Sequence, residues 1–346
     1  MKIKLALSFD DVLLVPQYSN IESRVDDTSV AGFLGNLELR VPIVASPMDT
    51  VTGVSMAAAM ARMGGLGIIH RYTRLEEQVA MVRLGISRAA QLKFPEPAVA
   101  AAVGVTGDFA ERAQSLCDAG AAVICVDVAH GHHELVRRAL EELRTSLGDG
   151  VHLMAGNVAT LEGFNALADW GANSIRVGIG GGSACSTRIC TGTGVPTLQS
   201  VLDCARSDRD VTLIADGGIR SSGDIVKALA AGADLVMLGR LLAATSQAPG
   251  SIVRIGGQRH KTYRGMASAE AQAEWRGRVS SLEGVSSTVP LSGDVEDVVG
   301  ELVRGIRSGL SYSGCRSIPE LQARAKFVRQ TSAGAVESTA HINLST

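Results

Sequence analysis

The sequence has few aromatic residues and no cluster of basic residues, and both absences argue against a nucleic-acid-binding protein. Aromatic residues make up 3% of the 346 residues, and 33 Lys and Arg residues nearly balance 35 Asp and Glu residues, for a formal charge of −2. Binding to phosphate backbones or anionic membranes needs an excess of positive charge, and stacking on bases needs aromatic rings. The sequence therefore predicts no nucleic-acid partner and no membrane partner.

Long apolar runs and paired cysteines are also missing. No run reaches the roughly 18 residues of a membrane span, and Ser-Phe-Asp-Asp at 8–11 interrupts the N-terminal apolar stretch, so we expect no signal peptide. The six cysteines lack C-x-x-C spacing, which predicts reduced thiols in a cytoplasmic protein. His130, His132 and His133 do not share a helical face, so we interpret them as solvated loop residues rather than metal ligands.

What the sequence does contain is an alternation of short apolar runs with helix-like segments. Continuous apolar runs indicate strands of a parallel sheet covered by helices, and eight such units predict a (β/α)8 TIM barrel, with a doubly wound open sheet as the alternative. We expect one catalytic domain over residues 1–330 without an inserted regulatory domain, and a flexible tail at 331–346. The apolar runs are 42–45, 66–70, 98–103, 121–128, 151–155, 174–177, 211–215 and 235–238, and helical periodicity occurs at 52–63, 75–84, 109–119, 133–147 and 224–231.

A glycine-rich segment follows the sixth predicted strand. Residues 178–188 read Gly-Ile-Gly-Gly-Gly-Ser-Ala-Cys-Ser-Thr-Arg, so Cys185 lies among backbone N–H donors and close to Arg188. Such surroundings activate a thiol as a nucleophile; the alternative is a structural cysteine in a glycine-rich turn. Barrel enzymes carry their chemistry on the loops after the strands. Because nearly every predicted strand is followed by a group able to bind or react, we favour a catalytic Cys185.

Two further loops have the composition of a phosphate site. Asp216-Gly217-Gly218 and Gly239-Arg240 follow the seventh and eighth predicted strands, where barrels commonly bind phosphate through backbone N–H groups. Asp216 is expected to accept hydrogen bonds from ribose hydroxyls; ordinary barrel turns are the alternative. Residues 261–284, polar and dotted with glycine, are expected to fold over the barrel mouth as a lid, and residues 295–310 to form a closing amphipathic helix.

Taken together, the motifs resemble those of the IMP dehydrogenase / GMP reductase family. The resemblance runs from about residue 7 to about residue 330 and implies a TIM barrel, a purine nucleotide substrate, a nicotinamide cofactor and a homotetramer. The matching stretches are Leu-Ser-Phe-Asp-Asp-Val-Leu-Leu-Val-Pro at 7–16, Ser-Pro-Met-Asp-Thr-Val at 46–51, Met-Ala-Gly-Asn-Val at 154–158, the segment 178–188, Ala-Asp-Gly-Gly-Ile at 215–219, Val-Met-Leu-Gly at 236–239 and Tyr-Arg-Gly-Met at 263–266.

Within that family the chain is more similar to GMP reductase. Residues 85–97 are too few for the paired regulatory domain usual in IMP dehydrogenases, and no Arg-Tyr pair, which activates water in those enzymes, lies between Met266 and Glu283. The resemblance implies NADPH-dependent reductive deamination of GMP to an IMP-type product and ammonia. The alternatives are an IMP dehydrogenase without the regulatory domain, a non-catalytic purine-nucleotide binder, and an unrelated phosphate-binding barrel lyase. The lyase fits least, because Lys227 lies inside a predicted helix.

The resemblance also assigns residue roles. Cys185 would attack C2 of the purine to give a thioimidate, while Thr187 and Glu283 relay a proton to the departing ammonia. The implied substrate-binding residues are Ser46, Met48, Ser183, Asp216, Gly217, Gly218, Gly239, Arg240, Tyr263, Gly265, Met266, Ala267, Ser280, Ser281, Leu282 and Gly284. The implied cofactor-binding residues are Ser23 and Arg24 from a neighbouring subunit, with Arg71, Asp127, Val128, Ala129, Ile179, Gly180, Ser308, Gly309, Leu310 and Ser311. Gly180, Gly182, Cys185 and Arg188 are assigned to a potassium ion.

Several positions depart from the reductase pattern. Arg240 replaces a small residue at the phosphate, Gly181 stands where proline is usual, and Ala267 stands where a serine helps to read the base. Ser46-Pro47 and Arg71 are similar to dehydrogenases, and 280–282 lacks the arginine that reductases place before the glutamate. These departures lead to the hypothesis that the base is a guanine analogue, such as a deazaguanine, rather than guanine itself.

Overall fold

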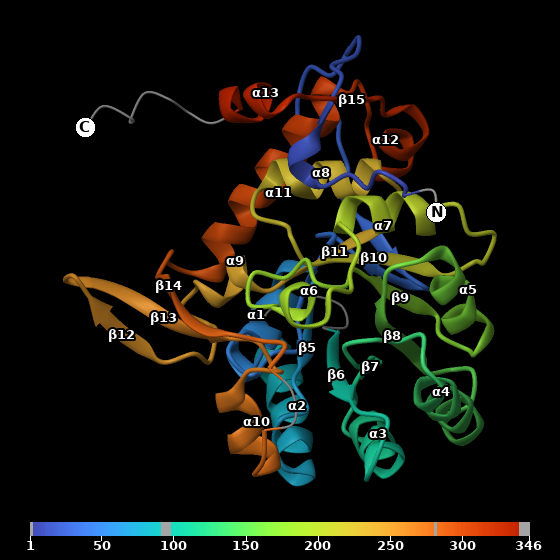
Figure 1. Ribbon diagram of the computed structural model, residues 1–346, viewed down its shortest axis with the longest axis vertical. Helices are drawn as coiled ribbons and strands as arrows, with labels where there is room; N and C mark the ends of the chain where they lie inside the picture. Colours follow the sequence, from blue (N-terminus) through green and yellow to red (C-terminus); the bar gives the residue numbers. More distant parts are fainter. Residues whose placement is uncertain (1–2, 91–97, 280–281, 339–346) are drawn as a thin grey trace.

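The computed structural model describes residues 3–90, 98–279 and 282–338 and contains a closed barrel of eight parallel strands surrounded by helices (Figure 1). The predicted (β/α)8 architecture is therefore confirmed. All eight predicted strands are present, and β11 pairs with β4 to close the barrel. In barrel order the strands are β4 (Ile43–Ala45), β5 (Leu66–Ile69), β6 (Val99–Val103), β7 (Val123–Asp127), β8 (His152–Val158), β9 (Ser174–Val177), β10 (Thr212–Asp216) and β11 (Leu235–Leu238).

The helices that cover the barrel are amphipathic, as the periodicity predicted. In α4, Val136, Leu140 and Leu143 are buried against the sheet, while Glu134 and Arg137 form an ion pair at the surface. Some helices have a side-chain N-cap: the hydroxyls of Thr160 and Ser221 accept hydrogen bonds from backbone N–H groups in the first turns of α5 and α8. The bounds are α1 (Val54–Met63), α2 (Leu75–Ala89), α3 (Phe109–Asp118), α4 (Glu134–Leu147), α5 (Leu161–Asp169), α7 (Thr197–Cys204), α8 (Ser222–Ala230) and α9 (Arg240–Ala243).

The core has two parts because both faces of the barrel strands are buried. One cluster fills the barrel interior with side chains such as Val44, Ile68 and Met237, and the other fills the space between strands and helices. All five residues of β6 are buried, which explains why the strands read as continuous apolar runs. The hairpin of β2 (Gly32–Leu34) and β3 (Leu37–Leu39) adds Leu34 and Leu39 to the interior cluster.

A small antiparallel sheet follows the barrel. It consists of β12 (Ile252–Ile255), β13 (Gln258–Arg264) and β14 (Ser286–Pro290), with α10 (Ala269–Arg276) between the last two strands. The β12–β13 hairpin projects away from the barrel (Figure 1). The end of β13 and the turn after it reach the barrel mouth, since Tyr263, Gly265 and Met266 line the cavity there. The segment expected to act as a lid thus has regular structure and contributes to the cavity wall.

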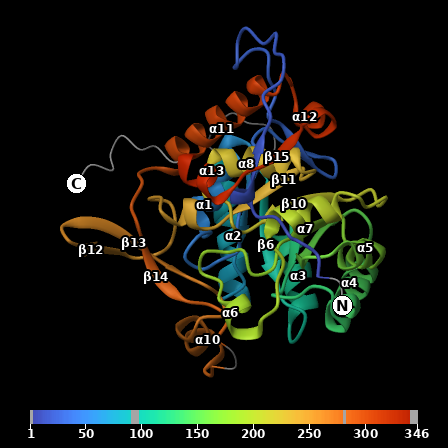
Figure 2. The same cartoon turned by 45° about the horizontal axis from the view of Figure 1, so that its top comes forward.

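The last elements close the fold on one side of the barrel. The predicted closing helix is α11 (Val295–Tyr312), which packs against α8 (Figures 1 and 2). After α12 (Ile318–Arg324), β15 (Phe327–Arg329) pairs antiparallel with β1 (Val12–Leu14), just after the short 3-10 helix η1 (Phe9–Asp11). The chain then forms α13 (Ser332–Glu337), capped by the hydroxyl of Thr331. The prediction of a flexible tail at 331–346 did not include this helix, and residues 339–346 lie outside the described ranges.

None of the helices over the described ranges combines the length and hydrophobicity that a membrane span requires. In the same ranges, no group of His, Cys, Asp and Glu side chains is arranged to hold a metal ion. His130 and His133 are exposed and His132 is partly exposed, as predicted for loop residues, and His133 caps α4 by accepting a hydrogen bond from the Leu135 N–H.

His152, at the start of β8, makes the stability of the fold depend on pH. Burial, with a smaller contribution from the charge of Arg144, lowers the pKa of His152 to about 4. Below the usual histidine pKa of about 6.5, the unfolded chain takes up a proton that the folded chain does not, so stability falls as the pH drops from about 6.5 toward 4. Above that window both states are neutral and His152 adds no pH dependence.

We expect this residue alone to lower the free energy of unfolding by about 2 kcal/mol between pH 6.5 and pH 5. Urea unfolding at the two pH values measures the effect in the parent and in His152→Gln, whose side chain carries no titrating proton. The parent should lose more stability than the variant on acidification. Equal losses would show that His152 does not control this pH dependence.

Candidate active site

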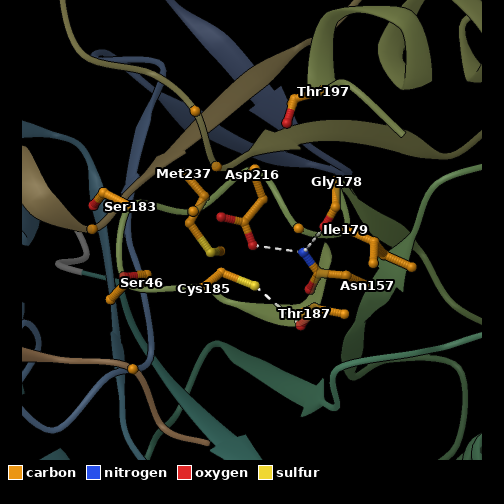
Figure 3. A pocket seen from close by; sticks show the side chains of 18 of the residues that line it. Ser46, Asn157, Gly178, Ile179, Ser183, Cys185, Thr187, Thr197, Asp216 and Met237 are labelled. Atoms are coloured by element: carbon orange, nitrogen blue, oxygen red, sulfur yellow. Dashed lines mark hydrogen bonds between the residues drawn. The ribbon is translucent and has the colours of Figure 1, made fainter. Parts of the chain in front are cut away.

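A cavity of about 590 Å³ opens at the carboxyl ends of the barrel strands. Residues at the carboxyl end of every barrel strand except β6, or in the loop after it, line the cavity, so the convergence expected from the strand-end rule is observed. Figure 3 shows Cys185, Thr187, Asn157 and Asp216 pointing toward one another across this space. The predicted site residues that line the cavity are Ser46, Met48, Arg71, Asp127, Val128, Ala129, Ile179, Gly180, Gly182, Ser183, Cys185, Thr187, Arg188, Asp216, Gly217, Gly218, Gly239, Arg240, Tyr263, Gly265, Met266, Ala267 and Glu283.

Three side chains form a hydrogen-bonded run in the cavity. The Cys185 thiol donates to Oγ1 of Thr187 at 3.1 Å, and the Thr187 hydroxyl donates to Oε2 of Glu283 at 3.0 Å. Figure 3 shows the first of these bonds. The arrangement can carry a proton from the sulfur to the carboxylate, because each atom lies within hydrogen-bond distance of the next.

The backbone brings Glu283 beside Cys185 through a short antiparallel pairing. Cys185 forms an isolated β-bridge with Gly284, the Ser186 N–H donates to the Glu283 carbonyl at 2.9 Å, and the Val285 N–H donates to the Ala184 carbonyl at 3.0 Å. Thr187 then begins the short helix α6 (Thr187–Thr191). The position of the relay is therefore set by main-chain hydrogen bonds rather than by the side chains alone.

Gly178 allows the catalytic loop to leave β9 close to β10. A Cβ atom at this position would lie 2.0 Å from the Asp216 carbonyl oxygen, and the residue has φ of 145°. Only glycine tolerates both the contact and the positive φ. The loop therefore starts directly beside Asp216, so that the sulfur and the carboxylate share one cavity.

Arg176 is a site residue that the sequence analysis missed. Its side chain, 8% exposed, donates from Nη1 to Asp127 at 2.5 Å and from Nη2 to Asp216 at 2.9 Å. Burial by itself lowers the pKa of Arg176, but the two carboxylates overcome this and raise it well above its usual value. Asn157 adds a hydrogen bond to Asp216 at 2.8 Å. The sequence signal was a charged residue in the middle of an apolar strand.

The far end of the cavity fits an anionic group. Ser183 donates to the Tyr263 hydroxyl at 3.4 Å, and burial raises the pKa of Tyr263, which keeps this phenol neutral. Arg240 is exposed beside them and has no carboxylate partner among the ion pairs of the described ranges. Oγ of Ser46 and Oγ1 of Thr197 line the same cavity and are buried without a hydrogen-bond partner. Unpaired polar groups of this kind indicate a polar ligand.

The remaining cofactor residues lie outside this cavity. Arg24 donates to Oγ of Ser308 at 3.0 Å, and its guanidinium lies 5.8 Å from the ring centre of Tyr312. Leu310 is completely buried in the core, because it follows Ile306 on the face of α11 that packs inward, so its side chain is not available to a cofactor. Ser23, Arg24, Ser308, Gly309 and Ser311 do not line the cavity.

Two substrate residues support the site through the backbone instead of lining it. The Leu282 carbonyl accepts from the Ser186 hydroxyl at 3.0 Å, and Gly284 forms the bridge to Cys185. Ser280 and Ser281 lie outside the described ranges. Gln272, which the sequence analysis did not select, also lines the cavity.

Two of the four residues assigned to a potassium ion have other contacts within the loop. The Gly182 carbonyl accepts a hydrogen bond from the Cys185 N–H at 3.0 Å. The Arg188 side chain lies directly against Gly180 and carries a positive charge without a lone pair to donate. The assignment of these residues to a potassium ion stays a prediction, and no step of the chemistry is derived through a cation.

Comparison with known proteins identifies the family. A model of the IMP dehydrogenase / GMP reductase domain matches residues 6–341. The chain belongs to the IMP dehydrogenase / GMP reductase family. Members of this family are oxidoreductases that use a nicotinamide cofactor.

Proteins named IMP dehydrogenase and proteins named GMP reductase are both similar to this chain. An inosine-5′-monophosphate dehydrogenase of Nitrosopumilus maritimus is 34% identical over 472 aligned positions, covering 99% of both chains. A GMP reductase of Leishmania major is 33% identical over 475 positions, covering 97% of this chain and 96% of the relative. A crystal structure of GMP reductase from Trypanosoma brucei, in complex with guanosine 5′-monophosphate, matches with a TM-score of 0.92 at 34% identity and 98% coverage of both chains.

Replacing Arg176 should strongly destabilise the protein. Arg176→Met leaves two carboxylates facing each other in a largely buried place, and breaking a buried ion pair in this way costs about 3 kcal/mol or more. We expect urea unfolding to show this loss, with a smaller one for Arg176→Lys, which keeps the charge. Arg209→Met, which removes an exposed arginine paired with Asp169, is the control and should have a much weaker effect. Equal stability of Arg176→Met and the parent would contradict the bridging role.

Proposed function

We propose that this protein catalyses the NADPH-dependent reductive deamination of GMP, or of a guanine nucleotide analogue such as a deazaguanine nucleotide, to the IMP-type product and ammonia. The observation that carries the proposal is the run from Cys185 through Thr187 to Glu283, facing Asp216 in a cavity of nucleotide size. A nucleophile, a proton relay and a ribose-binding carboxylate are the groups that such a reaction requires.

The relay accounts for the first half of the reaction. The thiol proton moves through Thr187 to Glu283 as the sulfur bonds to C2 of the base. The same proton path then serves the exocyclic amine, so that the C2–N bond breaks and ammonia leaves, with the base held as a thioimidate. A nicotinamide cofactor, when bound, would supply the hydride that C2 receives. As that C–H bond forms, the C–S bond breaks and the Cys185 thiolate is regenerated.

The residues at the end of the cavity that fits an anionic group would hold the nucleotide. Asp216, fixed by Arg176 and Asn157, would accept hydrogen bonds from the ribose hydroxyls. The unpaired guanidinium of Arg240 would pair with the phosphate, a charge-assisted contact of the stronger kind. Met48, Met266 and Ala267 line the wall near the base. Ser183, Gly217, Gly218, Gly239 and Tyr263 complete the phosphate end.

The part of the cavity wall at the end of β7 would hold the nicotinamide cofactor. Asp127, Val128 and Ala129 follow β7 and line the cavity beside Ile179 and Gly180. Arg71 lies on the same wall, with its Nε 3.7 Å from Oδ2 of Asp127 and without a hydrogen-bond partner. A dinucleotide would thus meet the carboxylate of Asp127, the main chain of the neighbouring residues and the guanidinium of Arg71.

The second cofactor cluster supports a homotetramer. Ser23, Arg24, Ser308 and Ser311 are grouped around α11, away from the cavity of their own chain. We infer that they contact the cofactor of a neighbouring subunit in the cytoplasmic enzyme.

An IMP dehydrogenase reaction is the second candidate, because relatives of that name are equally similar. The length of the chain does not separate the two activities. Relatives named IMP dehydrogenase and relatives named GMP reductase both align over more positions than the 346 residues of this chain. The feature that favours the reductase is the carboxylate of Glu283 at hydrogen-bond distance from Thr187, together with the missing Arg-Tyr pair.

The activity is tested with the purified full chain. We expect NADPH oxidation and ammonia release with GMP or a deazaguanine nucleotide, and no NADH formation from IMP and NAD. Cys185→Ala should abolish turnover, whereas Cys190→Ala, which removes an exposed thiol from the same loop, should retain it. NADH formation from IMP would identify a dehydrogenase, and full activity of Cys185→Ala would exclude the covalent mechanism.

The variant Glu283→Gln tests the proton relay separately from nucleotide binding. The amide keeps the hydrogen bond to Thr187 but accepts no proton, so we expect kcat to fall on the order of 100-fold, as for loss of a general acid–base group. The KM for the nucleotide should change little, because Glu283 acts on the proton rather than on binding. Ammonia release in single-turnover experiments should slow by the same factor. An unchanged kcat would remove Glu283 from the relay.

A further inference from the structure

Arg188 joins the two ends of the loop that carries Cys185. Its Nη2 donates to the Val195 carbonyl at 2.6 Å and lies 3.4 Å from the Ile179 carbonyl. Ile179 precedes Cys185 in the chain and Val195 follows it, and the two residues form only an isolated antiparallel bridge. One guanidinium nitrogen therefore joins the start of the loop, just after β9, to its end, just before α7.

The side chain of Arg188, although exposed, lies directly against bare backbone at two glycines. Its Cγ and Nε are 2.5 and 2.8 Å from the position of a Cβ atom at Gly180, and 2.8 and 2.9 Å from that at Gly194. Any side chain at either position would push the arginine away from the carbonyls. Two glycines from opposite ends of the loop thus leave room for one extended side chain.

The charge of Arg188 has no acidic partner. None of the ion pairs in the described ranges includes this residue, although most other arginines near the cavity contact carboxylates. Its two hydrogen bonds both go to carbonyl oxygens. The charge of Arg188 is therefore matched by main-chain oxygens at the two ends of the loop.

We propose that Arg188 is a positioning residue that holds the catalytic loop closed and so fixes the Cys185 sulfur against Thr187. A loop with this much glycine has many conformations to lose on ordering. Arg188 lies in α6 with Thr187, so its bonds to Ile179 and Val195 fix the helix that carries the relay hydroxyl. The kinetic consequence rests on the proposed function, but the effect on loop order does not.

The test compares Arg188→Met, Arg188→Lys and Arg188→Ala with the parent and with Arg206→Met. Arg206 is exposed at the end of α7 and pairs with Asp203, so its loss serves as the matched control. Hydrogen exchange over residues 178–196 reports loop order without any substrate, and the rate of Cys185 alkylation by iodoacetamide reports the position of the sulfur. Steady-state assays report kcat and KM, and added guanidinium ions, at concentrations below those that unfold the protein, test rescue of Arg188→Ala.

We expect Arg188→Met to exchange faster across 178–196 and to lose kcat on the order of 100-fold, the effect of misplacing a reacting group by about 1 Å. The KM for the nucleotide should change less than threefold. Lysine, whose nitrogen falls one bond short, should restore part of the activity, and guanidinium ions should restore part of it in Arg188→Ala. Addition of potassium should not replace them.

Unchanged exchange and unchanged alkylation in Arg188→Met would overturn the proposal, as would rescue by potassium in place of guanidinium. If no guanine nucleotide is turned over by the parent but Arg188→Met still loosens the loop, the proposed function fails and the positioning role stands. If the parent is active and the variant keeps both its activity and its loop order, the positioning role fails alone.

Discussion

The contact on which the site depends is the hydrogen bond between Thr187 and Glu283, which joins residues 96 positions apart. Neither residue has a chemical role without the other, since the hydroxyl passes a proton only if a carboxylate accepts it. The antiparallel pairing around Cys185 and Gly284 makes this contact possible. The segment after the barrel is therefore not only a cover for the cavity. It brings Glu283, the proton acceptor of the relay, to Cys185, which the barrel holds.

Three arginines distribute positive charge through the site in different ways. Arg176 is buried between two carboxylates, Arg188 bonds to carbonyl oxygens, and Arg240 has no acidic partner among the described ion pairs. The first two stabilise the walls and the loop, because their charges are already matched by protein groups. Of these three, only Arg240 is available to an anionic ligand, in line with the proposal that the phosphate of a nucleotide binds at the Arg240 end of the cavity and the base near the sulfur.

The sequence was sufficient for the architecture and for the residues that follow the strands. Continuous apolar runs report strands buried on both faces, and the strand-end rule then places Cys185, Asp127 and Asp216 in one cavity. The role of Arg176 was not predicted, because a residue within an apolar run gives no indication of which neighbouring strands its side chain reaches. The burial of Leu310 was not predicted for a related reason: the motif around it is recognisable, but the side of the helix that it occupies depends on packing. The short helix within 331–346 also escaped prediction, since small polar residues give a weak periodic signal.

The account stands on a covalent bond between the Cys185 sulfur and C2 of the base. Mass spectrometry of the enzyme quenched during turnover of GMP or a deazaguanine nucleotide tests it most directly. The account predicts an adduct on the peptide that contains Cys185, with the mass of the nucleotide less ammonia, and its absence in Cys185→Ala. Turnover without any such adduct, when quenching captures the steady state, would contradict it.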